Sequence, residues 1–199
     1  MKTTIVSSLV ASAAAFAPAS QTQSTSALMA TTPAPFANEI GDDFVIDQTG
    51  RCICGAVEFH AKGKLAFSEL CHCRACAWAA SVTPVHVIGV EISELDYKTG
   101  KDKVVVVNGL GKMIHGRCSQ CMTQVFQKPQ GENYVALFPP TFRIGGDDSL
   151  EQKLPDYYLP RMHTNYENRA RDATDSLPKF KTFPPDNEVN ADGSLKNAE

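Results

Sequence analysis

The sequence predicts a mainly β protein with a single folded domain, in which small antiparallel sheets are joined by long loops. Short runs of β-branched or alternating apolar residues recur along the chain and are bounded by glycine, proline or asparagine turn signals. No segment shows sustained helical periodicity. With 199 residues, of which 43% are hydrophobic and 21% charged, the chain can bury one core of ordinary size but not two.

The strand predictions follow the chain in order. Residues 57–61 alternate apolar and polar side chains after a glycine turn, as in a half-buried strand. Residues 104–107 are all valine and run into an Asn-Gly turn, and residues 134–138 are stopped by two prolines. Residues 82–92 contain a proline and a glycine, so we expect broken extended structure there. Only residues 164–175 could form a short helix.

Residues 1–38 have the composition of a targeting presequence. Lys2 is their only charged residue, residues 5–15 are a short apolar stretch, and alanines at 13–15 are acceptable to a signal peptidase. The Ser- and Thr-rich sequence that follows is typical of a transit peptide. Ala-Phe-Ala-Pro at residues 15–18 is similar to the junction in bipartite plastid presequences of diatoms and related algae. We therefore expect a plastid location; the alternative is a secretory signal followed by a disordered linker.

The rest of the chain divides into a domain and a tail. Residues 44–184 carry the strand signals and every cysteine, and we expect the folded domain there. Residues 185–199 are polar without an apolar period, and we expect a disordered tail.

Charge and hydropathy exclude two classes of partner. Nineteen basic and 22 acidic residues give a formal net charge of −3, and no cluster of lysine and arginine offers a footprint for nucleic acid. No apolar run approaches the ~20 residues that cross a bilayer, so we expect no membrane contact in the mature form.

Seven cysteines in tight groups are the most informative feature of the sequence. Their odd number, and pairs separated by one residue, fit a disulfide framework poorly. Thiolates at spacings of two and three residues can instead converge on one metal ion, with Zn–S distances of about 2.3 Å. We therefore expect metal binding by Cys52-Ile53-Cys54, by Cys71-His72-Cys73 with Cys76, and by Cys118-Ser119-Gln120-Cys121.

Seven sulfur ligands divide into four plus three. Four thiolates close a structural zinc site, whereas three leave one coordination position for a substrate. Cys71, Cys73 and Cys76 lie within six residues, and this compactness favours them as the catalytic site, although the spacing allows other partitions. The structural site would then consist of Cys52, Cys54, Cys118 and Cys121.

The ligand type also indicates the substrate class. A zinc ion held by three thiolates has a formal site charge of −1 and is a weaker Lewis acid than zinc held by neutral histidines. Activation of water is therefore less natural there than binding of a soft sulfur ligand, which zinc keeps as thiolate near neutral pH. We expect a thiol substrate.

Three motifs, taken in order, resemble one known family. Cys52-Ile53-Cys54-Gly55-Ala56-Val57, Cys71-His72-Cys73-Arg74-Ala75-Cys76 and Cys118-Ser119-Gln120-Cys121 are similar to the signature of the glutathione-dependent formaldehyde-activating enzyme family, which also includes centromere protein V. The likeness continues through residues 82–87 and 175–180 and covers about residues 45–184. It implies a structural zinc on the cysteines at 52, 54, 118 and 121 and a catalytic zinc on those at 71, 73 and 76.

The resemblance also implies a reaction. Members of the family form or cleave the C–S bond between glutathione and formaldehyde, giving S-(hydroxymethyl)glutathione, which is a carbon–sulfur lyase reaction. The implied partners are therefore glutathione and an aldehyde. Two stretches depart from the common pattern: Met122-Thr123 stands where many members have Gly-Thr, and residues 77–81 replace basic residues and a glycine.

Several other residues carry a weaker signal. Alternation in the Cys-His-Cys segment points the ring of His72 away from the metal, so we expect it to support the ligands or to pack. We expect His163 at the surface; the alternative is a place near the active-site mouth, because Pro160-Arg161-Met162-His163 resembles a stretch of the family there. We expect His86 and His115 in structural roles. Trp78 is expected to pack in the core, with a wall of the thiol pocket as the alternative. The side chains that could bind glutathione carboxylates are Arg74, Arg117, Lys112 and Arg161.

Two functions compete with the lyase. A zinc-stabilised interaction module would need no open coordination position, so the three-cysteine group favours an enzyme. A redox sensor built on that group would need exposed thiols of low pKa in the metal-free protein.

Overall fold

The computed structural model describes residues 45–146, 153–185 and 187–196, and its fold is mainly β, as the sequence predicts. The presequence predicted at residues 1–38 lies outside the described residues. The strands are β1 (Val45–Arg51), β2 (Glu58–Lys64), β3 (Phe67–Cys71), β4 (Val85–Glu91), β5 (Leu95–Thr99), β6 (Val104–Asn108), β7 (Met113–Cys118), β8 (Gln124–Pro129), β9 (Tyr134–Leu137), β10 (Met162–Thr164), β11 (Lys179–Phe180) and β12 (Glu188–Val189).

Helical structure is sparse within the described ranges. One α-helix is present, α1 (Arg74–Ala80). The 3₁₀ turns are η1 (Ile92–Glu94), η2 (Lys101–Lys103), η3 (Leu110–Lys112), η4 (Pro139–Thr141), η5 (Ile144–Gly146), η6 (Asp156–Tyr158) and η7 (Tyr166–Asn168). None of the described helices is long and apolar enough to cross a bilayer.

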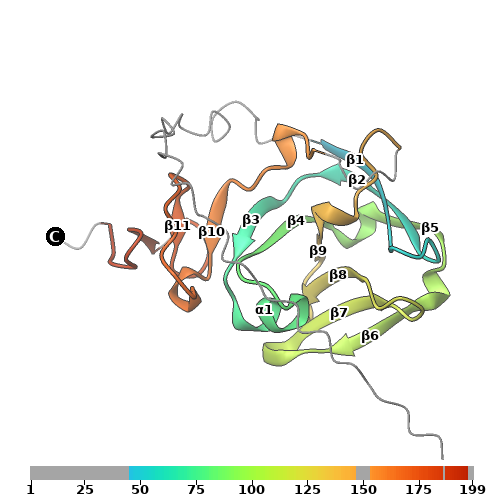
Figure 1. Cartoon of the computed structure of the whole chain (residues 1–199), viewed down its shortest axis with the longest axis horizontal. Coiled ribbons are helices and arrows are strands. Elements are labelled where there is room, and N and C mark those ends of the chain that lie inside the picture. The colour runs from blue at the N-terminus through green and yellow to red at the C-terminus, as the bar shows by residue number, and fades with distance from the viewer. Residues whose placement is uncertain (1–44, 147–152, 186, 197–199) are drawn as a thin grey trace, which may run out of the picture. The chain divides into compact units, whose positions relative to one another are not determined.

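The strands form two sheets. A three-stranded antiparallel sheet has the order β1-β2-β5, and a nine-stranded sheet has the order β12-β11-β10-β3-β4-β9-β8-β7-β6. Figure 1 shows β4, β9, β8, β7 and β6 side by side. Within the larger sheet β10 pairs in parallel with both β3 and β11, and this brings the late part of the chain beside the end of β3.

The main hydrophobic core is built by residues from both sheets. Ile46, Phe59, Ile88 and Leu137 are at most 1% exposed. Full burial of one such side chain stabilises the fold by about 1.5–3 kcal/mol. Cys52 and Cys118 belong to the same buried cluster, so the first cysteine group is part of the core. The other core members are Val57, Ala61, Leu65, Val90, Val125, Val135, Phe142 and Tyr158.

The prediction of broken extended structure at residues 82–92 is wrong for most of that segment. β4 runs without interruption through Gly89. A Cβ at Gly89 would lie 2.2 Å from a ring carbon of Phe67 on the neighbouring strand. The glycine therefore makes room for an aromatic side chain and does not break the strand.

The helix predicted at residues 164–175 is absent. That segment contains the end of β10, the turn η7 and irregular backbone, with Asn165 in the left-handed region at φ 50°. The prediction of a disordered tail from residue 185 also fails at residues 188–189, because β12 pairs with β11 and Val189 is 2% exposed. In both places contacts with distant parts of the chain decide the structure.

The sequence did not indicate α1. Its seven residues complete about two turns, which is too short for an apolar period to show. Cys73 caps the helix, since its sulfur accepts a hydrogen bond from the backbone N–H of Cys76 at 3.1 Å. Ser81 ends the helix in the left-handed region at φ 57°. The cap uses the same sulfur that the sequence assigns to the catalytic site.

Candidate metal centres

The first cysteine group joins two tight turns at the ends of β1 and β7. In one turn Gly55 N–H donates to the carbonyl of Cys52 at 3.0 Å, and in the other Met122 N–H donates to the carbonyl of Cys118 at 2.9 Å. Gly55 and Met122 have φ values of 74° and 61°. The turn after Cys121, where many family members have glycine, accommodates Met122 in the left-handed region, with its side chain 52% exposed.

The four sulfur atoms of this group converge. The four-cysteine cluster is Cys52, Cys54, Cys118 and Cys121, and all four ligand atoms lie within 4.8 Å of one another. Tetrahedral zinc with Zn–S bonds of about 2.3 Å places its sulfurs about 3.8 Å apart. The sulfur of Cys54 lies 3.4 Å from that of Cys52 and 3.8 Å from that of Cys118. The donor set therefore fits a closed tetrahedral ion.

The members of the four-cysteine cluster differ in how deeply they are buried. Cys52 and Cys118 have no exposed surface. Burial raises the pKa of the Cys52 thiol to about 12 in the metal-free chain. Burial also acts to raise the pKa of Cys121, but hydrogen bonds from Thr123 outweigh it and lower the value to about 6. A bound cation would take the place of the proton on Cys52.

The second group is the three-cysteine cluster, which consists of Cys71, Cys73 and Cys76. Cys71 ends β3, Cys73 caps α1 and Cys76 lies in the first turn of that helix. Their sulfurs also lie within 4.8 Å of one another, and the Sγ atoms of Cys71 and Cys76 are 3.7 Å apart. The Sγ atoms of Cys73 and Cys76 are 2.6 Å apart, a distance that would open by about 1 Å around zinc. The predicted partition into four and three cysteines is therefore the one that the fold assembles.

No fourth ligand completes the three-cysteine cluster among the His, Cys, Asp and Glu side chains of the described residues. Sulfur contacts within the group lower the pKa of Cys73 to about 3, because Cys71 and Cys76 hydrogen-bond to its thiolate. The same contacts, together with burial, raise the pKa of Cys76. Burial raises the pKa of the neighbouring Glu69 to about 8. The cluster thus holds a thiolate in a weakly solvated place.

Two amides that the sequence analysis missed contact this cluster. Gln127 is 2% exposed, and its Nε2 donates to the sulfur of Cys76 at 3.1 Å. Gln124 Nε2 donates in turn to Gln127 Oε1 at 3.2 Å. Asn165 Nδ2 donates to the sulfur of Cys71 at 3.5 Å. Isolated amides in a strand and a loop carry no periodic signal, so only the fold reveals them.

The burial of the histidines agrees with the predictions except at His163. His72 is 3% exposed and supports its neighbours, as expected, but His163 is 2% exposed, so the prediction of a surface histidine is wrong. Their rings are joined by a hydrogen bond of 2.8 Å between His72 Nε2 and His163 Nδ1. Burial lowers the pKa of His72 to about 4 and lowers that of His163. His115 is buried, and a hydrogen bond of 3.1 Å joins its Nδ1 to Gln124 Nε2.

A cavity of about 670 Å³ lies beside His72 and His163. Leu70 and His72 contribute to its lining, together with residues 170–175. Leu70 alternates with Cys71 along β3, so the cavity is on the face of the strand opposite to the Cys71 sulfur.

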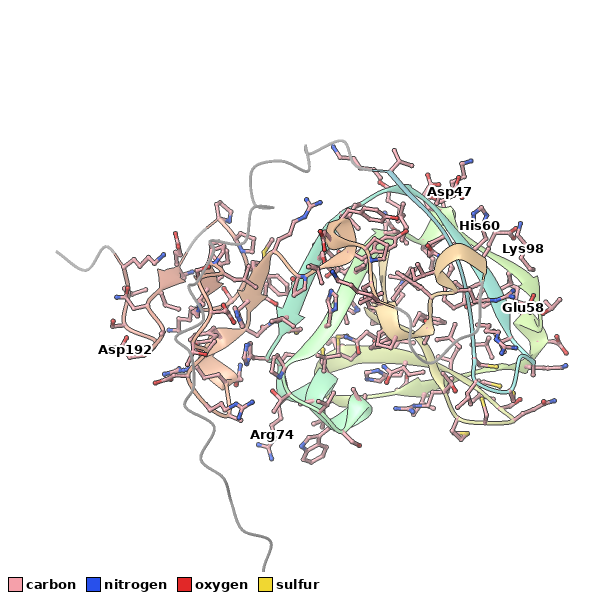
Figure 2. All side chains as sticks on the ribbon, turned by 45° about the horizontal axis from the view of Figure 1, so that its top comes forward. Asp47, Glu58, His60, Arg74, Lys98 and Asp192 are labelled. Carbon is pink, nitrogen blue, oxygen red and sulfur yellow. The ribbon has the colours of Figure 1, made fainter. Side chains whose placement is uncertain are left out.

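The aromatic and basic candidates lie around α1. Trp78 is 63% exposed, so the prediction of core packing is wrong. The guanidinium of Arg74 lies 5.1 Å from the centre of the Trp78 ring, and Figure 2 shows Arg74 extending outward from the start of α1. Arg117 donates to the carbonyls of Ala79 and Met122, and so ties the helix to the turn after Cys121. Lys112 is exposed, and Arg161 is half-buried.

Comparison with known proteins identifies the family of this chain. The model of the glutathione-dependent formaldehyde-activating enzyme family matches residues 47–159. Among solved structures, the chain is similar to that of a Rhodobacter sphaeroides protein with 19% identity and a TM-score of 0.42, covering 58% of this chain and 99% of that chain. A search of curated proteins gave no match. Because the family model spans more than half of the 199 residues, the chain belongs to the glutathione-dependent formaldehyde-activating enzyme family.

Proposed function

We propose that the chain is a zinc-dependent carbon–sulfur lyase that forms or cleaves the C–S bond of a glutathione–aldehyde adduct such as S-(hydroxymethyl)glutathione. The observation that carries the proposal is the contrast between four converging sulfurs and three. Four thiolates fill a tetrahedral ion, whereas three leave a position for a substrate. Family membership supports glutathione and formaldehyde as the substrates.

The chemistry needs a thiolate and an aldehyde carbon held together. Zinc on three thiolates would supply a soft position that keeps a substrate thiol deprotonated near neutral pH. The sulfur adds to the aldehyde carbon, the C=O π bond breaks, and the oxygen takes up the proton that the thiol has lost, so that RSH and H₂CO give RSCH₂OH. Confinement of both reactants at contact distance lowers the barrier, since the two-body encounter has already been made.

The chain's own side chains prepare this place. Amide N–H groups of Gln127 and Asn165 point at the sulfurs of Cys76 and Cys71. Hydrogen bonds to a ligating sulfur withdraw charge from it and hold it in one orientation. Burial of Cys71 and Cys76, at 4% and 3% exposed, keeps water from competing for the same groups. Cys71, Cys73 and Cys76 are the residues that we propose carry the reaction.

Turnover by the zinc-loaded full-length chain tests the proposal. The parent, Cys73→Ser and the control His60→Ala are compared by NMR exchange between free glutathione and its formaldehyde adduct. We expect the parent and the control to exceed the uncatalysed exchange rate at least tenfold, and Cys73→Ser to fall to it. Uncatalysed exchange with the parent would overturn the lyase assignment.

A non-enzymatic interaction module is the second candidate, and one surface favours it. β6 is an edge strand of the nine-stranded sheet. Its side chains Val105, Val106 and Val107 are 39%, 61% and 44% exposed. Exposed apolar edge strands can pair with another chain. Bound zinc without turnover would favour this reading.

For the location, we propose the plastid, on the basis of the Ala-Phe-Ala-Pro junction at residues 15–18. Residues 1–38 fused to a fluorescent protein in a diatom should direct it to the plastid. Fluorescence in the medium or secretory compartments would support the secretory alternative instead.

A further inference from the structure

A network of hydrogen bonds extends from His72, which lies between two ligands of the three-cysteine cluster, to Lys179. His72 Nε2 lies 2.8 Å from His163 Nδ1, and both oxygens of Asp175 lie 3.0 Å from His163 Nε2. Lys179 Nζ continues the chain with a contact of 3.3 Å to Asp175 Oδ1. His72, His163 and Lys179 are 3%, 2% and 5% exposed. Burial makes each unmade hydrogen bond of these three side chains costly, so the network holds them in place, whereas the Asp175 side chain that links two of them is 44% exposed.

The direction of each hydrogen bond is fixed from the carboxylate end. Lys179 can only donate, and it donates to Asp175 and to the carbonyl of Leu177. The Asp175 carboxylate accepts, so the proton of His163 is on Nε2. Nδ1 of the neutral His163 ring is then the acceptor for the N–H of His72. The ring of His72 is therefore oriented by a residue 91 positions later in the chain.

His72 lies between two of the three sulfur ligands. Its backbone N–H donates to the carbonyl of Thr164 at 3.0 Å, and its ring meets the edge of Tyr166 with centroids 5.1 Å apart. The pairing of β10 with β3 places Thr164 opposite Cys71. Backbone and ring of His72 are thus both held by residues 163–166. A shift of the His72 backbone would move the sulfurs of Cys71 and Cys73, because these residues are bonded to it on either side.

We propose that His163, oriented by Asp175, is a positioning residue for the three-cysteine cluster. It holds His72, and through it the backbone on both sides, so that the sulfurs of Cys71 and Cys73 keep the separation that one metal ion requires. The inference rests on the proposed function only in that the three-cysteine cluster binds a metal. His163 and Asp175 lie beyond residues 47–159, which the family model matches.

A purely structural role predicts a different result from a positioning role. If the network only stabilised the fold, its loss would weaken metal binding at both cysteine clusters or at neither. If it positions ligands, its loss weakens the three-cysteine cluster alone. The four-cysteine cluster of the same molecule is therefore an internal reference, because its ligands come from other turns of the chain.

The experiment measures Co²⁺ binding to the full-length chain, without substrate. Sulfur-to-cobalt charge-transfer absorption reports each cluster, and the portion lost in Cys73→Ser belongs to the three-cysteine cluster. His163→Ala should lower Co²⁺ affinity there 10–100-fold in competition with a chelator. His163→Asn, whose side-chain oxygen can take the place of Nδ1 as acceptor, should recover most of the affinity.

The matched control is a second His–Asp pair in the other sheet. His60 on β2 contacts Asp47 on β1 at 2.6 Å, and Figure 2 shows the two side by side. His60→Ala should leave Co²⁺ affinity at both clusters within twofold of the parent. A larger loss with His60→Ala would mean that removal of any His–Asp pair disturbs metal binding, and the proposal would be overturned.

Three further results would contradict the proposal. The first is that His163→Ala binds Co²⁺ at the three-cysteine cluster with the affinity of the parent, and the second is that its Co²⁺ affinity falls equally at both clusters. The third is that His163→Asn binds Co²⁺ as weakly as His163→Ala. Should His163→Ala fail to fold, Asp175→Asn replaces it, with a loss of at least tenfold expected and parental affinity contradicting the idea. If the parent protein binds Co²⁺ at this cluster but does not turn over the glutathione–formaldehyde adduct, only the lyase proposal is contradicted.

Discussion

The two cysteine clusters use the same ligand atom and are held in different ways. The four-cysteine cluster joins segments 64 positions apart, and two of its members, Cys52 and Cys118, are fully buried in the hydrophobic core. The three-cysteine cluster lies within six residues, and its sulfurs accept hydrogen bonds from Gln127 and Asn165. Cys71 and Cys76 also pack in a second, smaller hydrophobic cluster, with Val85, Val87, Ala136 and Phe138. The first cluster therefore ties two distant segments into the main core, whereas the second lies in a smaller core and receives amide hydrogen bonds at two of its sulfurs.

This contrast indicates what a metal ion would do at each cluster. An ion in the first cluster closes a long loop across the core and so contributes to folding. An ion in the second cluster closes no long loop, because strand, cap and helix already bring its ligands together. We expect the two sites to respond differently to every change below, beginning with the largest effect.

Loss of one ligand should separate the clusters most clearly. Cys118→Ser removes a fully buried sulfur, and because metal binding at such sites is worth on the order of 10 kcal/mol, we expect the domain to unfold. Cys73→Ser should leave a cooperative thermal transition and a native far-ultraviolet circular dichroism spectrum. Equal loss of structure in the two variants would remove the distinction between a structural and a functional cluster.

Protons should be released unequally when zinc binds. Burial raises the pKa of Cys52 to about 12, and contacts within the other group raise the pKa of Cys76, so each cluster has a thiol that must lose its proton to the solvent. Below about pH 6 Cys121 takes up a proton as well, because its pKa is lowered only to about 6, whereas Cys73, with its pKa lowered to about 3, remains a thiolate. Lower pH therefore weakens the four-cysteine cluster more steeply, by about tenfold per pH unit for each additional proton. Indicator-dye titration during zinc addition checks this; equal proton counts at the two clusters would contradict it.

Loss of one amide contact should have a smaller effect, confined to the second cluster. Gln127→Leu keeps the volume but removes the N–H that points at Cys76, and we expect zinc affinity there to fall by up to about tenfold. Gln130→Leu, at an exposed position, is the control. If both variants bind zinc alike, the amide has no role at the cluster.

The two turns of the four-cysteine cluster should respond in opposite directions. Met122 has a left-handed backbone that disfavours side chains, so Met122→Gly should stabilise the zinc-loaded protein by about 1 kcal/mol. Gly55→Ala, at φ 74°, should destabilise it by a similar amount. Denaturant unfolding measures both, and changes of the same sign would show that turn geometry does not limit stability here.

Trp78→Ala should have the smallest effect on stability. Because Trp78 is 63% exposed, we expect the free energy of unfolding to change by less than about 0.5 kcal/mol. A rise in KM for glutathione with unchanged stability would identify Trp78 as a wall of the thiol pocket. A loss above about 2 kcal/mol would return it to the core packing that the sequence predicted.

The sequence predicted the features that depend on local pattern. The valine run at residues 104–107 forms β6, and residues 134–137 form β9, because both are short β-branched or aromatic segments with clear stops. The cysteine spacing predicted two convergent groups, since ligands within a few residues can reach one point.

The features that the sequence missed depend on distant partners. His163 is buried because β10 pairs with β3 and because Asp175 and His72 accept and donate beside it, and none of these is near in sequence. Residues 164–175 failed to form a helix for the same reason. α1 was missed because a cap by Cys73 and seven residues carry too little periodic signal.

The spacing of the ligands also sets an order of events during synthesis. On a growing chain, Cys71, Cys73 and Cys76 leave the ribosome almost together, and a metal ion can bind all three before Cys118 and Cys121 have emerged. Cys52 and Cys54 must wait until Cys121 has emerged, 67 positions after Cys54. A metal ion can thus bind this protein at two separate stages of its synthesis. The first stage is at the cluster that we propose binds substrate, and the later one is at the cluster that closes the core.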